Sequence, residues 1–223
     1  MGKSNLINSL LRHFGCKLVR LSNNEESEDQ FDPLERNDIA TLEALWGDAE
    51  FRKKYLSPQR QRLYEIVLSE IQSLEIYGPN CSLLDVGCGP GFFPRLLMDK
   101  GFKGQVSGCD FSAQAISLSS SLIPEGQFFQ HDIYSPIPEK YDLIICMETL
   151  EHLLHPEDGL KNLIQAAPRL ILTVPEGRKD SFRGHLNLWT KESFEVFLQK
   201  TLSDKEVQVS EVSNEKNLLA VIL

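Results

Sequence analysis

The stretch that most constrains the fold of this chain is residues 82–93, which read Ser-Leu-Leu-Asp-Val-Gly-Cys-Gly-Pro-Gly-Phe-Phe. Its apolar start predicts a buried strand, and the alternate glycines Gly87, Gly89 and Gly91 predict a tight turn into a helix. Glycine adopts positive φ and has no Cβ, so a ligand can lie against the backbone where the first helical N–H groups are free. We therefore expect this turn to bind a polar, sugar-like or anionic group.

The spacing of the glycines argues against one class of ligand. Dinucleotide-binding turns follow the pattern G-x-G-x-x-G, and here Phe92 and Pro94 occupy the positions where the third glycine would stand. The turn is therefore not expected to bind NAD.

Strand and helix patterns alternate along the chain after residue 80. The expected strands are 82–87, 105–110, 127–131, 141–147, 169–174, 205–212 and 217–223, and the expected helices are 92–100, 112–122, 156–166 and 190–200. This alternation predicts an α/β fold, with a doubly wound and mostly parallel sheet covered by helices on both faces. The last two strands are joined by a short turn, so they are expected to pair antiparallel.

The N-terminal part of the chain is expected to be helical. Residues 1–20 carry basic side chains and apolar residues at helical spacing, which predicts a basic amphipathic helix. This helix would dock on a membrane surface or a partner, or pack on its own domain. Residues 22–30 are polar and acidic and predict a linker. Two further helices are expected at 37–54 and 57–74, the second starting with Ser57-Pro58.

These patterns suggest three parts. They are the amphipathic helix with its linker at 1–30, the N-terminal helices at 31–79, and a ligand-binding domain at 80–223.

Composition limits the partners and the cellular compartment. The net charge of -9 and the pI near 5.1 offer no basic face for phosphate backbones, which argues against duplex nucleic acid. The five cysteines include no C-x-x-C pair, which fits a reducing compartment. With no pattern typical of a signal peptide or membrane span, a cytoplasmic location is expected, with residues 1–20 as a possible peripheral contact at the inner membrane face.

Polar residues follow the strands beside the glycine turn, where a doubly wound sheet binds its ligand. Asp110 ends the second expected strand, 23 residues after Gly87, where its carboxylate can accept both hydroxyls of a ribose. Phe111 could pack on a base, and Asp132-Ile133 could place a carboxylate near an exocyclic amine and an apolar side chain on a ring. Each aspartate taken alone could be an ordinary cap. Together with the turn, these residues describe an adenosine site.

The same segments resemble the successive motifs of class I S-adenosylmethionine-dependent methyltransferases. The resemblance rests on Leu-Asp-Val-Gly-Cys-Gly-Pro-Gly at 84–91, Gly-Cys-Asp-Phe-Ser at 108–112, His-Asp-Ile at 131–133 and Tyr-Asp-Leu-Ile-Ile-Cys-Met-Glu-Thr-Leu-Glu-His at 141–152. It implies a seven-stranded sheet of order 3-2-1-4-5-7-6 with S-adenosyl-L-methionine as cofactor. One departure is Ala166-Ala167-Pro168-Arg169, which replaces the usual Pro-Gly-Gly turn before the fifth strand.

The resemblance also implies roles for individual residues. It assigns the methionine and ribose end of the cofactor to the glycine turn, the ribose hydroxyls to Asp110, adenine packing to Phe111 and Ile133, and the adenine amine to Asp132. Met147 would lie beside the cofactor. The turn residues concerned are Asp85, Gly87, Cys88, Gly89 and Gly91.

Candidate proton acceptors follow the fourth strand. Glu148, Glu151, His152 and His155 are spaced i, i+3, i+4 and i+7, which would place them on one face if this stretch were helical. His185 belongs to the loop after the fifth strand, which should overhang the same site. We expect His152 and His185, together with Glu148 and Glu151, to be catalytic residues. His155 is expected merely to begin a helix.

Three functions remain open from the sequence. Segments around His152 and His185 resemble ubiquinone-type O-methyltransferases and methyltransferases of bacterial glycan assembly, which imply a small-molecule hydroxyl or a lipid-linked sugar as acceptor. A second resemblance is to small-RNA 2'-O-methyltransferases, in which Glu148, Glu151, His152 and His185 would bind a divalent metal. The third is a regulatory protein that binds S-adenosyl-L-methionine without catalysis.

Overall fold

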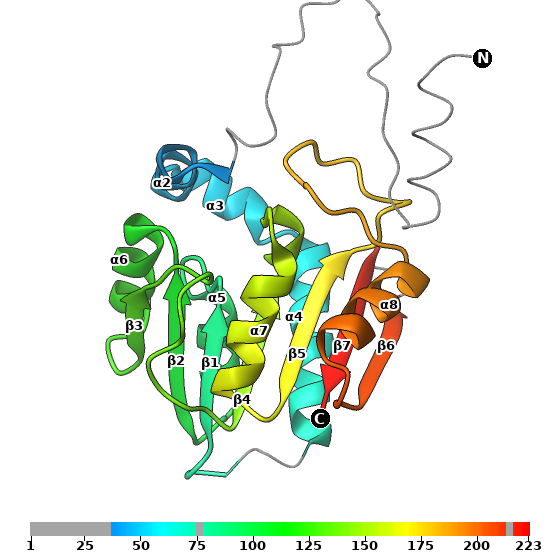
Figure 1. Cartoon of the computed structure of the whole chain (residues 1–223). Helices are drawn as coiled ribbons and strands as arrows, with labels where there is room; N and C mark the ends of the chain where they lie inside the picture. Colours follow the sequence, from blue (N-terminus) through cyan, green and yellow to red (C-terminus); the bar gives the residue numbers. More distant parts are fainter. Residues whose placement is uncertain (1–36, 75–77, 213–215) are drawn as a thin grey trace, which may run out of the picture.

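The computed structural model describes residues 37–74, 78–212 and 216–223 (Figure 1). The helix predicted at 1–20 and the linker predicted at 22–30 lie outside the described residues.

A single seven-stranded sheet forms the centre of the described part of the chain, in the order β3-β2-β1-β4-β5-β7-β6. Strands β1 to β5 run parallel to one another, and β7 pairs antiparallel with both β5 and β6. The predicted α/β class, strand order and antiparallel pair are therefore confirmed. The strands are β1 (Ser82–Val86), β2 (Gln105–Asp110), β3 (Gln127–Gln130), β4 (Leu143–Met147), β5 (Leu170–Pro175), β6 (Val207–Val212) and β7 (Asn217–Ile222).

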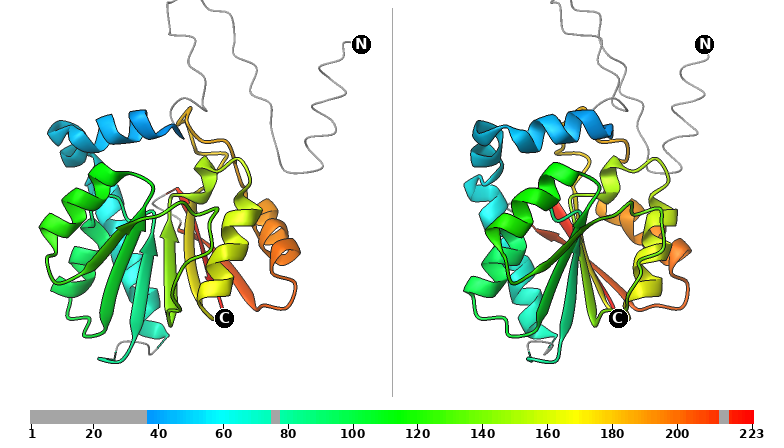
Figure 2. Two further views of the ribbon diagram at one scale, coloured as in Figure 1. Left: turned by 60° about the vertical axis from the view of Figure 1, so that its left-hand side comes forward. Right: turned by 90° about the vertical axis from the view of Figure 1, so that its left-hand side faces the viewer.

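Helices cover both faces of this sheet (Figures 1 and 2). One face carries α4 (Pro58–Ser73), α5 (Phe92–Asp99) and α6 (Ala113–Leu122), and the other carries α7 (Pro156–Ala166) and α8 (Lys191–Thr201). Alternate strand residues serve the two layers: Leu83 packs in the cluster with α4 and α5, whereas Leu84 packs in the cluster with α7 and α8. Burial on both faces explains why β4 is apolar throughout and β1 and β5 are largely apolar.

The helix predicted at 37–54 is instead two helices, α2 (Ile39–Gly47) and α3 (Ala49–Tyr55), so the single-helix prediction is wrong. Asp48 between them has extended backbone, and its carboxylate accepts hydrogen bonds from the N–H groups of Glu50 and Phe51. An aspartate that caps a new helix in this way competes with continuation of the old one. Helix α4 confirms the other N-terminal prediction, with Ser57 as its N-cap.

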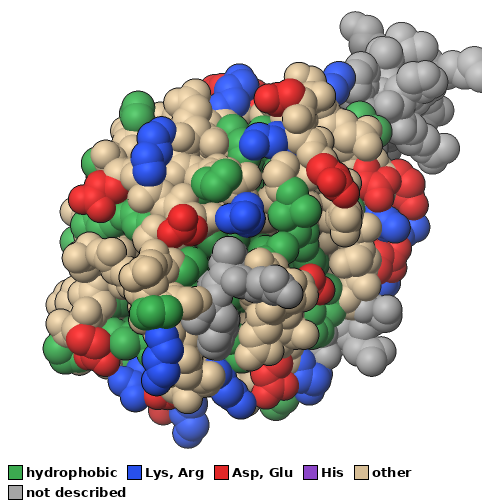
Figure 3. Space-filling view, turned by 90° about the horizontal axis from the view of Figure 1, so that it is seen from below, with side chains coloured by type: hydrophobic (Ala, Val, Ile, Leu, Met, Phe, Trp, Pro, Cys, Tyr) green, Lys and Arg blue, Asp and Glu red, His purple; other side chains and the backbone are tan. Residues whose placement is uncertain are grey.

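Helices α2 and α3 lie across the carboxyl ends of the strands, on the same side as the loop 176–190 (Figure 2). The opposite side, where the strands begin, shows basic and acidic side chains interspersed (Figure 3). Within the described residues, no helix combines the length and the apolar character that crossing a membrane requires.

Candidate functional site

The glycine turn joins β1 to α5 with all three glycines at positive φ: 76° at Gly87, 51° at Gly89 and 81° at Gly91. The N–H groups of Gly87 and Cys88 both donate to the carbonyl of Cys109 on β2, at 2.8 and 3.0 Å, which fixes the turn to the neighbouring strand. A Cβ at Gly87 would lie 2.3 Å from Thr149 Oγ1, so this position has room only for glycine. The sequence folds this way because no other residue tolerates both the backbone and the contact.

Asp110 ties the turn to the start of α6. Its Oδ2 accepts from Gly89 N at 2.8 Å, and its Oδ1 accepts from Ser112 N at 2.9 Å. Burial raises the pKa of this carboxyl, while the hydrogen bonds from Ser112 and Gly89 oppose that rise. Each carboxylate oxygen can accept a second hydrogen bond, so the carboxyl retains acceptor sites for a ligand hydroxyl.

Asp85 lies beneath the turn on β1 and is only 2% exposed. Its Oδ1 has no hydrogen-bond partner among the described residues, and burial, together with the nearby Asp110, raises its pKa well above the ordinary value. A buried carboxyl oxygen without a partner is unfavourable by about 1–3 kcal/mol. It would gain a partner if a ligand brought a donor, such as an ammonium group, to the turn.

The residues expected around a base surround the ends of β2 and β3. Phe111 is 40% exposed beside Asp110, whereas Ile133 is buried in the cluster with α7. Asp132 accepts from Tyr134 N at 3.0 Å, which is the ordinary capping role foreseen as its alternative. Met147 ends β4 and is almost fully buried.

Glu151, His152 and His185 form a cluster beyond the ends of β4 and β5. Glu151 is 0% exposed and neither of its carboxyl oxygens has a hydrogen-bond partner among the described residues. Its Oε1 lies 4.0 Å from His152 Nε2 and 3.8 Å from His185 Nε2, and one ligand atom from each residue falls within 4.8 Å of the others.

Opposing effects act on the protonation of this cluster. Burial and the neighbouring Glu148 raise the pKa of Glu151 well above its ordinary value. Burial and then His185 lower the pKa of His152 to about 4, so this imidazole is neutral near pH 7. Burial would raise the pKa of Asp180, but the hydrogen bond from His185 and those from the backbone hold it below the ordinary value.

Glu148 adjoins this cluster, but its carboxylate bonds to other residues. Its backbone has φ 51°, and its Oε1 accepts from Thr173 Oγ1 at 3.1 Å and from Asn217 Nδ2 at 2.8 Å. Its Oε2 lies 3.6 Å from Arg60 Nη1, whose guanidinium stacks 4.7 Å above the Tyr55 ring. Glu148 therefore belongs to an ion pair between α4 and the end of β4.

Helix α2 lies over the glycine turn and the start of α6. The Trp46 ring lies 3.2 Å from the place where a Cβ on Gly89 would be, so the indole packs on the glycine turn. Glu43 accepts from the N–H groups of Ala113 and Gln114 at 2.7 and 2.8 Å, at the start of α6. Just before the helix, Asn37 bonds to His152. Helix α2 and the residues just before it thus contact both the turn and the histidine cluster.

A glycine-rich turn, an acid at the end of β2 and two half-buried histidines around a buried glutamate thus share one edge of the sheet. Residues 49–201 match a protein-family model described as a methyltransferase domain. The chain belongs to this methyltransferase family. The resemblance to class I S-adenosylmethionine-dependent methyltransferases is thereby confirmed.

Individual proteins are similar to this methyltransferase over part or most of its length. A ubiquinone biosynthesis O-methyltransferase from Hydrogenovibrio crunogenus is 31% identical over 150 residues, which are 63% of this chain and 56% of the relative. The chain thus spans little more than half the length of that relative. Two solved structures share the fold at 19% identity. Magnesium protoporphyrin IX methyltransferase from Synechocystis has a TM-score of 0.63, covering 87% of this chain and 99% of that one. The methyltransferase domain of bacterial CtHen1 has a TM-score of 0.61, covering 74% and 98%.

The methyltransferase brings together only some of the predicted acceptor-side residues. The condition for one helical face of Glu148, Glu151, His152 and His155 is not met, because only Leu150–His152 form a single 3-10 turn. Positive φ at Glu148 rotates its side chain toward α4 instead. His155 is 61% exposed and begins α7, as expected.

Several residues of this site were not predicted from the sequence. Asn37 and Asp180 hold the two imidazoles, Arg60 pairs with Glu148, and Asn187 Nδ2 donates to the carbonyl of Leu153 at 2.6 Å. Nothing in the local pattern marks Asn37 or Arg60, since their partners lie far away in the sequence. Asp180 and Asn187 flank His185, and their polar character in an overhanging loop was the available signal.

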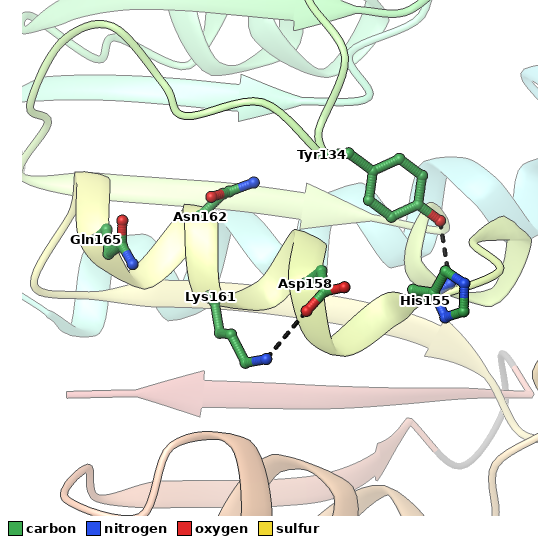
Figure 4. Close-up of a pocket in the computed structure, with 6 residues that line it drawn as sticks. All are labelled: Tyr134, His155, Asp158, Lys161, Asn162 and Gln165. Carbon is green, nitrogen blue, oxygen red and sulfur yellow. Dashed lines mark hydrogen bonds and ion pairs between the residues drawn. The ribbon is translucent and has the colours of Figure 1, made fainter.

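A separate hollow of about 480 Å³ lies along α7 (Figure 4). Its lining is Tyr134, His155, Asp158, Lys161, Asn162 and Gln165. None of the residues predicted to bind the cofactor or the acceptor lines it, so it is not the candidate site.

Proposed function

We propose that this protein transfers the methyl group of S-adenosyl-L-methionine to a hydroxyl group of a small molecule or a lipid-linked sugar. The observation that carries the proposal is the cluster of buried Glu151 with the half-buried His152 and His185, on the same sheet edge as the glycine turn. Parallel strands direct their carboxyl ends to a common edge, so donor and acceptor sites built there face each other.

The donor side is supported by the residues around the turn. Gly89 has no Cβ, so a flat group, here the Trp46 ring, can lie against the backbone of the turn, and Asp110 supplies carboxylate acceptors for ribose hydroxyls. The unpartnered oxygen of Asp85 fits the ammonium of a methionyl group. Phe111 offers a half-exposed ring for the adenine, with Asp132, Ile133 and Met147 nearby in the role the family resemblance gives them.

The acceptor side is supported by proton chemistry. A sulfonium methyl is already electrophilic, so the protein needs to align the reactants and remove the hydroxyl proton. His152 is neutral at physiological pH and can accept this proton on Nε2. Glu151 has a raised pKa and adjoins both imidazoles, so it is the next group able to hold the proton.

The relatives support a hydroxyl acceptor, because those matched over 56–59% of their length carry the name ubiquinone biosynthesis O-methyltransferase. The test is turnover of labelled S-adenosyl-L-methionine with a panel of phenols, catechols and glycan alcohols. Replacing His152 by glutamine should lower kcat by about 10²–10⁴-fold while leaving the affinity for S-adenosylhomocysteine unchanged. Binding of that product without turnover on any acceptor would instead support a regulatory protein.

A second candidate function follows from one observation, the unpartnered carboxylate between two imidazoles. Glu151, His152 and His185 offer one carboxylate and two ring nitrogens, a donor set suited to a divalent transition metal. Such a cation would lower the pKa of a bound hydroxyl, as in the RNA 2'-O-methyltransferases that the sequence resembles. Glu148 would not be a ligand, since Thr173, Asn217 and Arg60 occupy its carboxylate.

Calorimetry with Mn²⁺ and Mg²⁺ on chelator-treated protein decides between the two candidates. Binding that is lost in His185→Gln, together with methylation of RNA 3' ends, would favour the metal-dependent function. Turnover of small hydroxyl acceptors in the presence of chelator would exclude it.

A further inference from the structure

Asn37 connects the start of α2 to the histidine cluster, 115 residues away in the sequence. Its Nδ2 donates to the carbonyl oxygen of Gly184 at 3.1 Å, and its Oδ1 lies 2.8 Å from His152 Nδ1. A backbone carbonyl has no proton to give, so the NH2 end of the amide must face Gly184. The amide oxygen is therefore the atom that faces the imidazole.

An amide oxygen only accepts hydrogen bonds, so His152 Nδ1 must carry the proton in this contact. A neutral imidazole has one protonated and one bare nitrogen, which leaves Nε2 of His152 bare. His185 is held in the same way: its Nδ1 lies 2.5 Å from the Asp180 carboxylate, and its Nε2 faces Glu151. Both imidazoles thus present Nε2 to one buried carboxyl group.

We propose that Asn37 is a positioning residue, whose amide holds His152 in the Nδ1-protonated tautomer with Nε2 bare toward Glu151. The role of bare Nε2 as proton acceptor rests on the proposed function, whereas the tautomer does not. Without Asn37, Nδ1 would lose the amide oxygen 2.8 Å away, and the two unpartnered oxygens of Glu151, one of them 4.0 Å from Nε2, would compete with the Gly184 carbonyl for the imidazole proton. A proton drawn onto Nε2 would block the nitrogen needed for chemistry.

The tautomer can be measured without any activity assay. The chain has five histidines, so long-range ¹H–¹⁵N spectra of ¹⁵N-histidine-labelled full-length protein are simple, and His152→Gln identifies the signal. At pH 7 the wild-type His152 should show protonated Nδ1 and bare Nε2. If the folded wild-type protein shows protonated Nε2 instead, the inference is wrong, whatever the variants do.

The variants test whether Asn37 is the cause. Asn37→Ala should move the His152 proton partly or wholly to Nε2 and lower kcat by about 10–100-fold, with unchanged affinity for S-adenosylhomocysteine. Asn37→Asp keeps an acceptor opposite Nδ1, so it should retain the wild-type tautomer and restore most of the kcat.

A matched control separates this role from mere loosening of α2. Asp38 is the adjacent residue, and its carboxylate caps α2 by accepting from Thr41 N. Asp38→Asn should leave the tautomer unchanged. A wild-type tautomer in Asn37→Ala, or an equal change in Asp38→Asn, would overturn the assignment. Wild-type protein with the expected tautomer but no methylation of any hydroxyl would contradict the proposed function alone.

Discussion

Replacing Gly87 by alanine tests how the glycine turn is held at the end of β1. The residue has φ 76°, a left-handed conformation that is unfavourable by about 1–2 kcal/mol for a residue with a Cβ. The new methyl group would also lie 2.3 Å from Thr149 Oγ1, and relieving an overlap of this kind costs about 1–3 kcal/mol. We expect Gly87→Ala to lower the free energy of unfolding by about 2–5 kcal/mol, the sum of the two effects.

Two other glycines separate these effects. Gly101 has φ 91°, and a Cβ added there would have no atom within 4 Å, so Gly101→Ala should show the backbone strain alone, about 1–2 kcal/mol. Gly47 ends α2 without positive φ and has equally open space, so Gly47→Ala should be neutral or stabilising by up to about 1 kcal/mol.

A double-mutant cycle with Thr149→Ala measures the contact itself. Removing Oγ1 and Cγ2 from Thr149 should reduce the effect of Gly87→Ala to that of Gly101→Ala, a coupling of about 1–3 kcal/mol. Urea unfolding followed by circular dichroism gives each free energy. Equal losses for Gly87→Ala and Gly101→Ala, or a coupling near zero, would refute the reasoning.

Three further predictions concern charged and titratable groups. Asp110→Asn should weaken binding of S-adenosylhomocysteine about 10–100-fold in calorimetry, because a hydrogen bond to a charged acceptor contributes about 1.5–3 kcal/mol. An unchanged affinity would show that Asp110 does not bind the ribose. The folded protein holds the pKa of His152 at about 4, below the ordinary value of 6.5. Between these two pH values the unfolded chain therefore binds a proton that the folded protein does not bind. The urea midpoint should fall as the pH falls through this window. In His152→Gln this slope should be smaller, and an identical slope would contradict the shift. Arg60→Met should lower the free energy of unfolding by about 3–5 kcal/mol, because it leaves the Glu148 carboxylate without its cation. Adding Glu148→Gln should recover much of this loss in urea titrations. A double variant as unstable as Arg60→Met alone would argue against the ion pair.

The parts of the fold that the sequence predicted are those with local causes. The order of apolar strands and amphipathic helices sets the sheet, and the glycine turn carries its own backbone requirement in Gly87, Gly89 and Gly91. The break at Asp48 was missed although Gly47-Asp48 is a local signal, a glycine that can end one helix followed by an aspartate that can cap the next, as the hydrogen bonds of Asp48 show.

The histidine cluster was predicted only in outline for a different reason. His152 and His185 could be placed at one edge from topology, but the exclusion of Glu148 depends on its positive φ and on Arg60 from α4. Likewise the partners of the imidazoles, Asn37 and Asp180, depend on how α2 and the loop 176–190 settle over the edge. Such contacts are decided by packing, and no local pattern encodes them.

The Trp46 indole of α2 packs on the glycine turn, and the amide of Asn37, two residues before the helix, hydrogen-bonds to His152. A donor that reached the turn by displacing this indole would also break the hydrogen bond between the Asn37 amide and His152, because both side chains belong to the one segment 37–46. The base would regain its tautomer only once this segment had returned over the bound donor. A compulsory order of substrate entry, with the donor first, is the kinetic signature that this arrangement would leave.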